Sequence, residues 1–570
     1  MFKPCSSRAN EAPSGFLFAG CAFTSDGASL PRLLQFLHRL FRLTLAGLLF
    51  ALSAPSGSAQ PSQHVVNGGF EDGLKAWQST GDVHVETNSP LEGKASAVIG
   101  PGAGSLAQRI ETGNGNDLTV SATIQSQRTN GWVFSARFLD KQGRELMTVD
   151  SLTDIEPSKQ DPRKFNHYMK AHPLTQWLEI VISKDPSAGS VLVDQVGLDM
   201  ADENAENLQP TCDLDQAMQP FWLGKTVYNE AILMLSQGGK AATGQLMFHP
   251  SRIISVQDYA LVTNYAEGTD YTIEGRTLVC TVSSRITRVR DEDLAKGELK
   301  WNNIGGKQVM VAYEHEDIWN PPHPAFVGDG LPNTIKKLEA HARLTVVAYG
   351  DSITHGVGAS RLSRLPPFMP PWPELVVRRL KTIYQDEQIQ LYNSAQSGAD
   401  STWGKRYAGR MVASLHPDLV IIAFGQNDFW KVSASDFANN ITDIMKTVRN
   451  KNPDAEFLLV STMRFDPAYT SKAQYWNVVG EYAAKLKAMA RPGVQFVDMT
   501  AISESVYAAK KPKDCLNDPL HPNDYLARWY AQSLVAALDP ASGRTPAAMT
   551  NSKSKEAAGP LGQNNSEVSR

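Results

Sequence analysis

The sequence predicts a protein of several domains, in which a flavodoxin-like three-layer α/β/α domain follows two β-rich domains of the sandwich or jelly-roll type. With 570 residues, the chain is much longer than the roughly 250 to 300 residues at which a single hydrophobic core stops growing. Short strand-like runs separated by Gly, Asn and Asp turns fill the chain from about residue 60 to residue 331. From residue 344 onward, short apolar runs alternate instead with segments of helical period.

Residues 1–59 are predicted to be a leader that contains a signal peptide. Three arginines precede the apolar run Leu43–Leu52, and small residues follow it up to Ala59, where we expect cleavage. The run is far shorter than the roughly 20 apolar residues that a membrane span needs. We therefore expect an exported protein, secreted or periplasmic, whose mature form has no stable membrane span; a retained anchor is the alternative.

The composition excludes partners that are recognised by charge alone. A formal net charge of -4 and a pI of about 6.3 leave no basic footprint for nucleic acid. Beyond the leader only Cys212, Cys280 and Cys515 remain, so the mature chain has room for at most one disulfide. No spacing suggests zinc and no metal-ligand cluster is evident, so we expect neither a metal nor a cofactor.

Residues 60–200 are predicted to form a β-sandwich, and residues 211–331 a second, smaller β-rich domain. The segments Val66–Gly73 and Val191–Leu198 resemble the first and last strands of carbohydrate-binding modules of the galactose-binding-like jelly-roll type. The resemblance implies a glycan-binding module. Because such sandwiches also serve as plain spacers, both roles stay open and no sugar-binding residue is assigned.

Residues 340–540 are predicted to hold a parallel sheet that is covered by helices on both faces, followed by a disordered tail at 541–570. Five short apolar strands in roughly 200 residues indicate a flavodoxin-like order. The expected strands are Leu344–Ala348, Ile389–Tyr392, Leu419–Phe424, Phe457–Val460 and Val494–Val497.

Polar residues stand directly after several of these strands. In an open α/β sheet, ligands bind outside the carboxyl ends of the strands, so the segments that follow the strands are expected to converge. The segments are Gly350–Ile353, Ser394–Gly398, Gly425–Asp428 and, before a closing helix at Asp524–Leu538, Asp518–His521.

This set of residues is the one that acyl transfer requires. A serine hydroxyl is a weak nucleophile until an imidazole takes its proton, and a carboxylate fixes the tautomer of that imidazole. Ser352, His521 and Asp518 suit these three roles. A tetrahedral oxyanion needs preorganised donors, which the backbone amides of Ser352 and Gly398 and the side chain of Asn427 can supply.

The four segments resemble, in order, the four sequence blocks of the SGNH or GDSL hydrolases, and the resemblance covers most of residues 344–538. It implies a serine esterase with the nucleophile, base, acid and oxyanion donors named above. One departure is Ala395, where many members carry another glycine, and this puts the shape of that turn in question.

Each segment also has a purely structural interpretation. Ser352 could cap the helix that follows, Gly398 could serve a tight turn, and the segments at 425–428 and 518–522 could be ordinary loops. Four such coincidences in the family's order favour the catalytic interpretation. His416 precedes the third strand and is expected at the opposite edge of the sheet.

Four further side chains are candidates for lining the substrate site: His355, Trp403, Phe429 and Trp430. The aromatic residues would stack on a sugar ring or, equally, pack beneath the loops. His355 would line the mouth of the site or lie on a solvated helix face.

Together these features predict an exported serine esterase that acts on short acyl esters, acetyl above all, of a carbohydrate or polysaccharide. Two alternatives remain: a lipid or thioester hydrolase of the same fold, and a glycan-binding protein whose hydrolase domain is vestigial.

Overall fold

The computed structural model describes residues 64–541 apart from 114–116, 128–131, 153–161, 173, 201–207, 291, 293–303 and 470–471. The predicted leader at 1–59 and residues 542–570 of the predicted tail lie outside the described residues. No helix in the described part is long and apolar enough to cross a bilayer. The described residues all belong to one compact unit.

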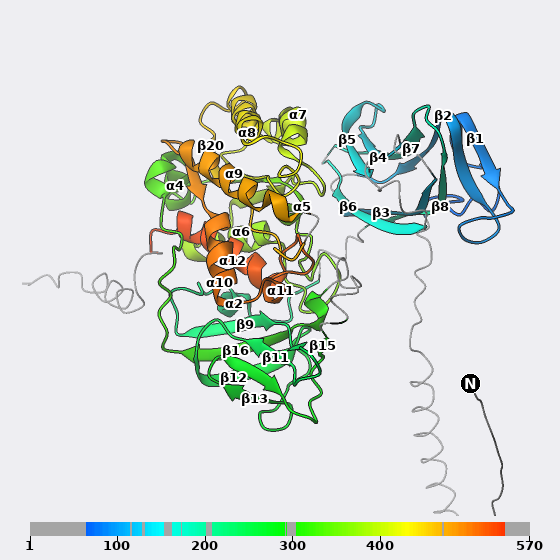
Figure 1. Cartoon of the computed structure of the whole chain (residues 1–570). Helices are drawn as coiled ribbons and strands as arrows, with labels where there is room; N and C mark the ends of the chain where they lie inside the picture. Colours follow the sequence, from blue (N-terminus) through cyan, green and yellow to red (C-terminus); the bar gives the residue numbers. More distant parts are fainter. Residues whose placement is uncertain are drawn as a thin grey trace, which may run out of the picture. The chain divides into compact units, whose positions relative to one another are not determined.

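The first β-domain is an antiparallel sheet of eight strands in the order β5-β4-β7-β2-β8-β3-β6, with β1 beside β2 (Figure 1). The N-terminal part of β2 pairs with β8 and its C-terminal part pairs with β7, so this long strand links the two layers of the sandwich. The fold confirms the predicted sandwich. The strands are β1 (Gln78–Glu86), β2 (Ser96–Glu111), β3 (Asp117–Gln127), β4 (Trp132–Leu139), β5 (Glu145–Leu152), β6 (Arg163–Lys170), β7 (Trp177–Lys184) and β8 (Ser190–Met200).

The opening of this domain differs from the expectation. Val66–Gly73 forms turns rather than a strand, and the first strand begins only at Gln78. Asn67 and Phe70 adopt positive φ angles, and the Trp77 indole N–H donates to the Asn67 carbonyl at 3.1 Å. Local side-chain and backbone bonds thus hold this segment, which is rich in Gly, Asn and Asp, in turns in place of the strand that the resemblance implied. The predicted last strand, by contrast, is present within β8.

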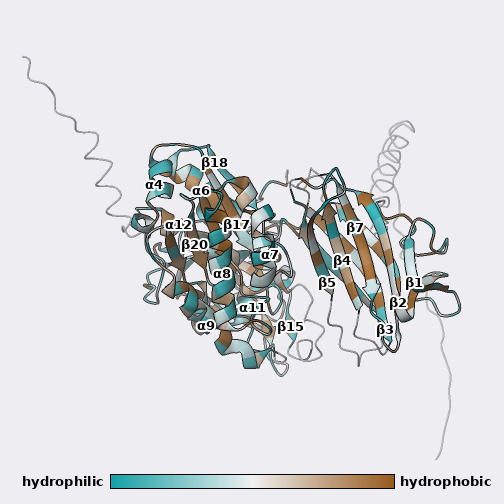
Figure 2. Ribbon diagram, turned by 90° about the horizontal axis from the view of Figure 1, so that it is seen from above, coloured by the Kyte–Doolittle hydropathy of each residue, from teal (hydrophilic) through white to brown (hydrophobic). Residues whose placement is uncertain are grey.

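Alternation of apolar and polar residues builds the sandwich core. Successive side chains of a strand point to opposite faces, so every second residue enters the space between the layers. Brown and paler segments alternate along β4 and β7 in Figure 2. Ile99, Leu106, Ile180, Ile182 and Leu198 are completely buried there.

The second β-rich domain consists of a three-stranded sheet in the order β12-β16-β9 and a five-stranded sheet in the order β13-β14-β11-β10-β15. These short strands agree with the predicted second β-rich region. They are β9 (Thr226–Ile232), β10 (Leu235–Ser236), β11 (Thr243–Gln245), β12 (Pro250–Asp258), β13 (Tyr271–Glu274), β14 (Thr277–Cys280), β15 (Val289–Arg290) and β16 (Val309–His315).

The C-terminal domain has a parallel sheet in the order β18-β17-β19-β20-β21, which is the predicted flavodoxin-like arrangement. Strands β18 and β19 lie on the two sides of β17, so the strand order reverses at β17, and ligands of open α/β sheets bind outside the carboxyl ends of the strands at such a point. The strands are β17 (Leu344–Gly350), β18 (Ile389–Asn393), β19 (Leu419–Ala423), β20 (Glu456–Val460) and β21 (Val494–Val497).

Helices cover both faces of this sheet, as predicted. Val346 of β17 packs in the cluster that contains α6 and α12, whereas Val347 and Tyr349 pack in the cluster that contains α7, α8 and α9. Figure 2 shows β17 and β20 in brown among these helices. The main helices are α4 (Pro332–Glu339), α6 (Trp372–Tyr384), α7 (Ser401–Met411), α8 (Ala434–Arg449), α9 (Trp476–Ala488), α10 (Met499–Ala509) and α12 (Asp524–Leu538).

Helix α12 is buried along its whole length. Its Trp529 contacts Phe221 and Trp222 of the second β-domain, with ring centroids 5.1 and 5.5 Å apart. The buried guanidinium of Arg528 donates to the backbone carbonyls of Tyr228 and Asn229 at 2.8 and 2.5 Å. A helix that is buried all round must lie between two layers, here the parallel sheet and the second β-domain.

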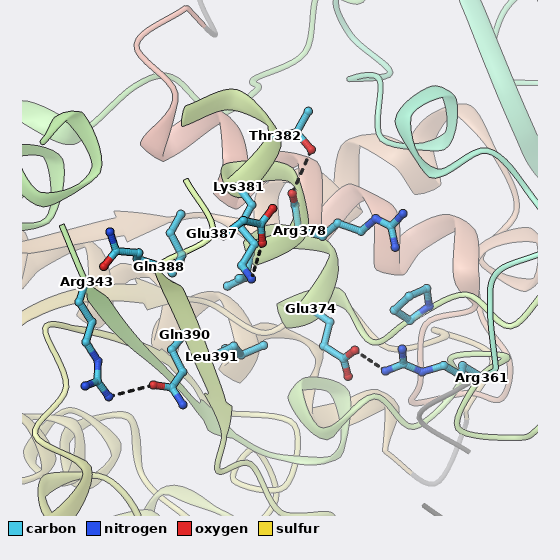
Figure 3. Close-up of a pocket in the computed structure, with 13 residues that line it drawn as sticks. Arg343, Arg361, Glu374, Arg378, Lys381, Thr382, Glu387, Gln388, Gln390 and Leu391 are labelled. Carbon is cyan, nitrogen blue, oxygen red and sulfur yellow. Dashed lines mark hydrogen bonds and ion pairs between the residues drawn. The ribbon is translucent and has the colours of Figure 1, made fainter. Parts of the chain in front are cut away.

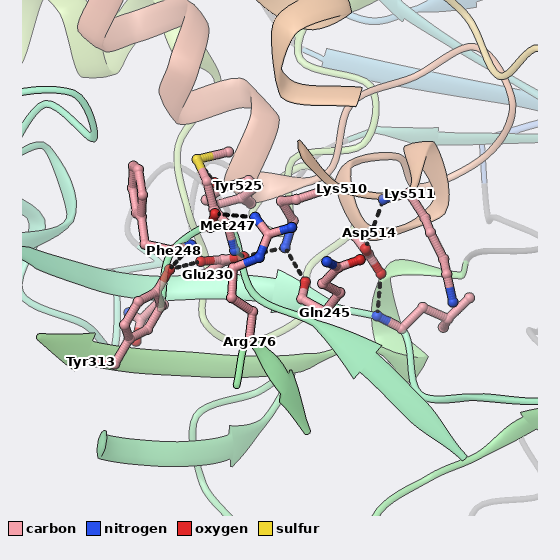
Figure 4. A network of polar contacts seen from close by, with 12 residues as sticks. Glu230, Gln245, Met247, Phe248, Arg276, Tyr313, Lys510, Lys511, Asp514 and Tyr525 are labelled. Atoms are coloured by element: carbon pink, nitrogen blue, oxygen red, sulfur yellow. Dashed lines mark hydrogen bonds and ion pairs between the residues drawn. The ribbon is translucent and has the colours of Figure 1, made fainter. Parts of the chain in front are cut away.

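A buried ion pair joins the same two domains (Figure 4). Lys510, which follows α10, pairs with Glu230 of β9, and both side chains are fully inaccessible. Glu230 also accepts from the Met247 N–H at 2.8 Å and from the Tyr313 hydroxyl at 2.5 Å. Burial alone would lower the pKa of Lys510, but the carboxylates of Glu230 and Asp514 outweigh it and raise that pKa, so the ammonium stays protonated.

We expect Glu230→Gln to reduce the free energy of unfolding by about 3–5 kcal/mol, because it removes the carboxylate that is paired with the buried Lys510 ammonium. Lys510→Met leaves the opposite charge and should cost about as much, while the double variant should cost less than the sum of the two. Urea unfolding followed by tryptophan fluorescence measures the effect.

The exposed pair Lys225–Glu316 of the same β-domain is the matched control. Lys225→Met should change the stability little or not at all, because exposed ion pairs are solvated in both states. If the exposed and the buried pair changed the free energy of unfolding equally, the buried Lys510–Glu230 pair would have no special part in joining the two domains.

Candidate active site

Ser352 lies at the start of the short helix that follows strand β17. Strand β17 ends at Gly350, and α5 (Ser352–His355) begins directly after Asp351. The Asp351 carboxylate caps this helix by accepting from the Ile353 N–H at 3.1 Å, and its second oxygen accepts from the Gln426 N–H at 3.1 Å. The cap role considered for Ser352 therefore belongs to Asp351, and the Ser352 side chain is left for another use.

Ser352, His521 and Asp518 form a continuous chain of hydrogen bonds. Ser352 Oγ lies 2.8 Å from His521 Nε2, and His521 Nδ1 lies 2.8 Å from Asp518 Oδ2. A carboxylate only accepts, so the imidazole carries its proton on Nδ1 and presents the Nε2 lone pair to the serine hydroxyl. This is the tautomer that a general base for Ser352 must have.

The charge of Asp518 controls the titration of His521. Burial would lower the pKa of His521, but the Asp518 carboxylate outweighs it and raises that pKa above its ordinary value. Burial conversely would raise the pKa of Asp518, but His521 and the backbone N–H groups of Leu520 and His521 lower it. Asp518 thus stays ionised, ready to stabilise an imidazolium.

Neighbouring segments hold the loop that carries His521. The Gln426 side chain donates to the Leu520 carbonyl at 3.0 Å, and the Asn517 N–H donates to the His521 carbonyl at 2.9 Å. Asn523 caps α12 by accepting from the Tyr525 and Leu526 N–H groups, both at 3.1 Å. His521 is therefore fixed between the block at 425–428 and the start of a buried helix.

The segment Ser394–Gly398 is fastened to the end of β17. The N–H groups of Ser394 and Gln396 donate to the carbonyls of Ala348 and Gly350 at 2.8 and 3.0 Å. Gly398 has a φ of +78°, in the left-handed region that favours glycine. Ala395 does not have a positive φ, so the turn does not require the glycine that many family members carry there.

Asn427 and Asp428 bind this segment and the helix after it. The Asn427 side-chain amide donates to the Ala399 carbonyl at 3.0 Å, and an amide group has a second N–H for an oxyanion. Asp428 accepts from the Ser401 N–H, the first of α7, at 2.9 Å, and burial raises its pKa to about 7. These bonds join Asn427 to the residue that follows the candidate donor Gly398, and Asp428 to the start of α7.

The four candidates for lining the substrate site have different environments. His355 is buried and bonds the Ser397 hydroxyl through Nδ1 at 2.9 Å. Phe429 is also buried and stacks on Phe465. Trp403 donates to the Thr148 carbonyl of the first β-domain at 3.2 Å. Trp430 is half-buried, with the Lys472 ammonium 4.4 Å from its ring centre.

The helix α6 and the strand β18 line a groove of about 900 Å³ (Figure 3). Ion pairs join Arg361 to Glu374 and Lys381 to Glu387 along it, which compensates these charges. None of the sequence-predicted site residues lines this groove. It is therefore separate from the candidate active site.

The described part of the chain gives no sign of a disulfide or metal centre. Cys212, Cys280 and Cys515 are all free. No group of three or more His, Cys, Asp or Glu side chains within the described ranges is arranged to hold a metal ion.

Sequence reasoning missed several residues that hold the site together. Asp351 and Asp428 lie inside the segments Gly350–Ile353 and Gly425–Asp428. A carboxyl group directly after an apolar strand indicates a buried acid that needs hydrogen-bond donors, and this pattern could have identified both residues. Gln396 and Gln426 had no such signal, because an isolated glutamine after a strand is common and its partners are distant in sequence.

Residues 348–529 match the sequence model of the GDSL-like Lipase/Acylhydrolase family. The match lies in the parallel-sheet region and confirms the prediction that this region is an SGNH-type serine ester hydrolase domain. No curated protein sequence matches the chain.

Several solved structures are similar to parts of the chain. The enzymatically active domain of tailspike protein 4 from bacteriophage CBA120 is 18% identical, with a TM-score of 0.21, over 24% of this chain and 21% of that one. The chain thus spans only about a fifth of that domain. TmCBM61, solved in complex with beta-1,4-galactotriose, is 18% identical, with a TM-score of 0.20, over 25% of this chain and 100% of that one. A catalytic mutant of Axe2, an acetylxylan esterase from Geobacillus stearothermophilus, is 19% identical, with a TM-score of 0.30, over 34% of this chain and 94% of that one.

The raised pKa of His521 predicts the pH dependence of hydrolysis. Protonated His521 has no lone pair for the serine proton, so kcat/KM should fall as the pH drops through a value above about 6.5. Asp518→Asn should move this acid limb to lower pH and reduce kcat about 10²- to 10⁴-fold, because it removes the charge and the acceptor that fix the imidazole. The pH profile of p-nitrophenyl acetate hydrolysis measures both effects.

Asp443→Asn, which removes an exposed carboxylate paired with Lys405, is the control and should leave the profile unchanged. An acid limb that stays in place in Asp518→Asn would count against the assigned pairing of Asp518 and His521.

Proposed function

We propose that the chain is an exported serine esterase that hydrolyses short acyl esters, acetyl above all, on a carbohydrate. The observation that carries the proposal is the chain of two 2.8 Å contacts from Ser352 Oγ through His521 to Asp518. This geometry joins a nucleophile to a base of the right tautomer, and the base to an ionised carboxylate.

In the first half of the proposed reaction, Ser352 Oγ attacks the ester carbonyl while its proton passes to His521 Nε2. The carbonyl oxygen becomes an oxyanion, which the N–H groups of Ser352, Gly398 and Asn427 stabilise. The bond to the leaving alcohol then breaks as His521 returns its proton to the alcohol oxygen. The product is an acyl group on Ser352.

In the second half, a water molecule takes the place of the alcohol. His521 Nε2 accepts a proton from the water as its oxygen attacks the acyl carbonyl, and the same donors hold the second oxyanion. Release of Ser352 Oγ, which recovers its proton from His521, yields the free acid. No step needs an oxidant or a cofactor.

Three features support a carbohydrate ester as the substrate. The leader resembles an export signal, and extracellular glycans are the acylated polymers that an exported enzyme meets. The first β-domain resembles a carbohydrate-binding module at its two ends. Trp430, three residues after Asn427, is only half-buried, and an indole ring suits stacking on a sugar face.

Replacement of the nucleophile gives the primary test of the proposal. Ser352→Ala should reduce the hydrolysis of p-nitrophenyl acetate by several orders of magnitude, because no other hydroxyl is bonded to His521 Nε2 among the described residues. Ser414→Ala, at an exposed serine of the same domain, should retain full activity, and thermal melting checks the fold of both. Activity in Ser352→Ala close to that of the unaltered protein would refute the mechanism.

A substrate screen separates the proposed activity from its alternatives. Acetylated xylan, acetylated mannan and pectin should release acetate, whereas long-chain acyl and thioester substrates should react poorly. Preference for long acyl chains would indicate a lipid hydrolase instead. Glycan affinity without hydrolysis of any ester would indicate a binding protein.

Trp430→Ala tests whether the Trp430 ring stacks on a sugar of the substrate. Loss of stacking should raise KM for an acetylated oligosaccharide about 5- to 10-fold and leave p-nitrophenyl acetate hydrolysis within about twofold, because only the former has a sugar face to stack. Trp430→Phe should keep most of the affinity. An equal loss on both substrates would show that Trp430 supports the loop structure instead.

A further inference from the structure

Strand β6 of the first β-domain contacts the segment Ser394–Gly398, called the oxyanion loop below because it carries the candidate oxyanion donor Gly398. His167 of β6 lies with Nε2 3.1 Å from the carbonyl oxygen of Ser397. A carbonyl oxygen only accepts, so His167 carries a proton on Nε2 and donates it to Ser397. The two residues are separated by 230 positions in the sequence.

The Ser397 carbonyl belongs to the same peptide unit as the Gly398 N–H. Because this unit is planar and nearly rigid, a bond that fixes the carbonyl also fixes the direction of the N–H at its other end. A hydrogen bond accepted by the carbonyl further polarises the unit, which strengthens the N–H as a donor. Any group that binds Ser397 O therefore acts on the oxyanion donor Gly398.

We propose that His167 is a positioning residue for the Gly398 oxyanion donor, so that the N-terminal β-sandwich completes the active site of the hydrolase domain. The inference rests on the proposed function, because it assumes that Gly398 stabilises an oxyanion. It assigns the sandwich a role in turnover that does not depend on glycan binding.

Further contacts show that β6 binds this loop at more than one point. The Lys170 N–H donates to the Gln396 side-chain oxygen at 3.3 Å, and Gln396 Nε2 lies 3.5 Å from Ser397 O. A Cβ atom added to Gly398 would lie 3.3 Å from Cε1 of His167, so the imidazole packs directly on this glycine. From the other side, His355 holds the Ser397 hydroxyl.

Bonds to helix α7 hold the sandwich in place independently of His167. His172 donates through Nε2 to the Arg410 carbonyl at 2.9 Å, since its Nδ1 accepts from the Leu174 N–H. Arg410 in turn donates to the Glu145 carbonyl at 2.7 Å. The interface thus contains a second histidine-to-carbonyl bond that does not involve the oxyanion loop, and it provides a matched control.

The test compares variants of these two histidines in the full chain. His167→Phe keeps an aromatic ring but loses the donor, and it should reduce kcat for p-nitrophenyl acetate about 10- to 100-fold with KM within about twofold. Loss of an oxyanion donor itself costs about 10²- to 10³-fold, and loss of its positioning should cost less. His167→Gln, whose amide N–H can reach the same carbonyl, should recover at least part of the rate.

The pH profile distinguishes a role in positioning from damage to the base. The acid limb of kcat/KM should stay in place in His167→Phe, because His521 and Asp518 keep their contacts. His172→Phe loses an equivalent bond across the same interface and should retain kcat within about twofold. Thermal melting verifies that each variant is folded.

The outcomes separate this inference from the proposed function. The positioning role of His167 is overturned if kcat falls no further in His167→Phe than in His172→Phe, or if kcat falls equally in His167→Gln and His167→Phe. In either case the loss of activity in Ser352→Ala would still stand. Failure of the esterase proposal would appear instead as undiminished hydrolysis by Ser352→Ala.

Discussion

The hydrogen bond between His521 Nδ1 and Asp518 is the interaction on which the rest of the site depends. It selects the tautomer in which Nε2, which lies 2.8 Å from Ser352 Oγ, carries the free lone pair. The loop that carries this pair leads into α12, which is buried between the parallel sheet and the second β-domain. Packing of that β-domain, with its buried Glu230–Lys510 pair, therefore supports the loop that carries His521.

Three carboxyl groups belong to the segments of the candidate site, Asp351 and Asp428 buried and Asp518 half-buried, and their environments give them different roles. Asp518 faces His521 and several N–H groups, so its pKa is lowered and it remains ionised. Burial raises the pKa of Asp351 to about 6 and that of Asp428 to about 7. Both instead accept backbone N–H groups, and by doing so they tie the block at 425–428 to α5 and α7.

Parts of the prediction that depend on local pattern agree closely with the structure. The expected strand Val494–Val497 and the closing helix Asp524–Leu538 have the observed bounds, because apolar periodicity and flanking caps are properties of a few neighbouring residues. The prediction was weakest where partners are remote in sequence. The fully buried Phe429, for example, stacks on Phe465, which belongs to a different loop.

The sequence by itself determined the layer architecture of the hydrolase domain and the residues available for acyl transfer, because apolar runs and motif spacing are patterns of residues that are close together in the sequence. Only the tertiary structure decided that Asp351 rather than Ser352 caps α5, that His355 bonds Ser397, and that His167 reaches the same peptide from another domain. The physical reason is that hydrogen-bond partners and desolvation depend on which surfaces pack together. No pattern of neighbouring residues reports a contact across 230 positions of the chain.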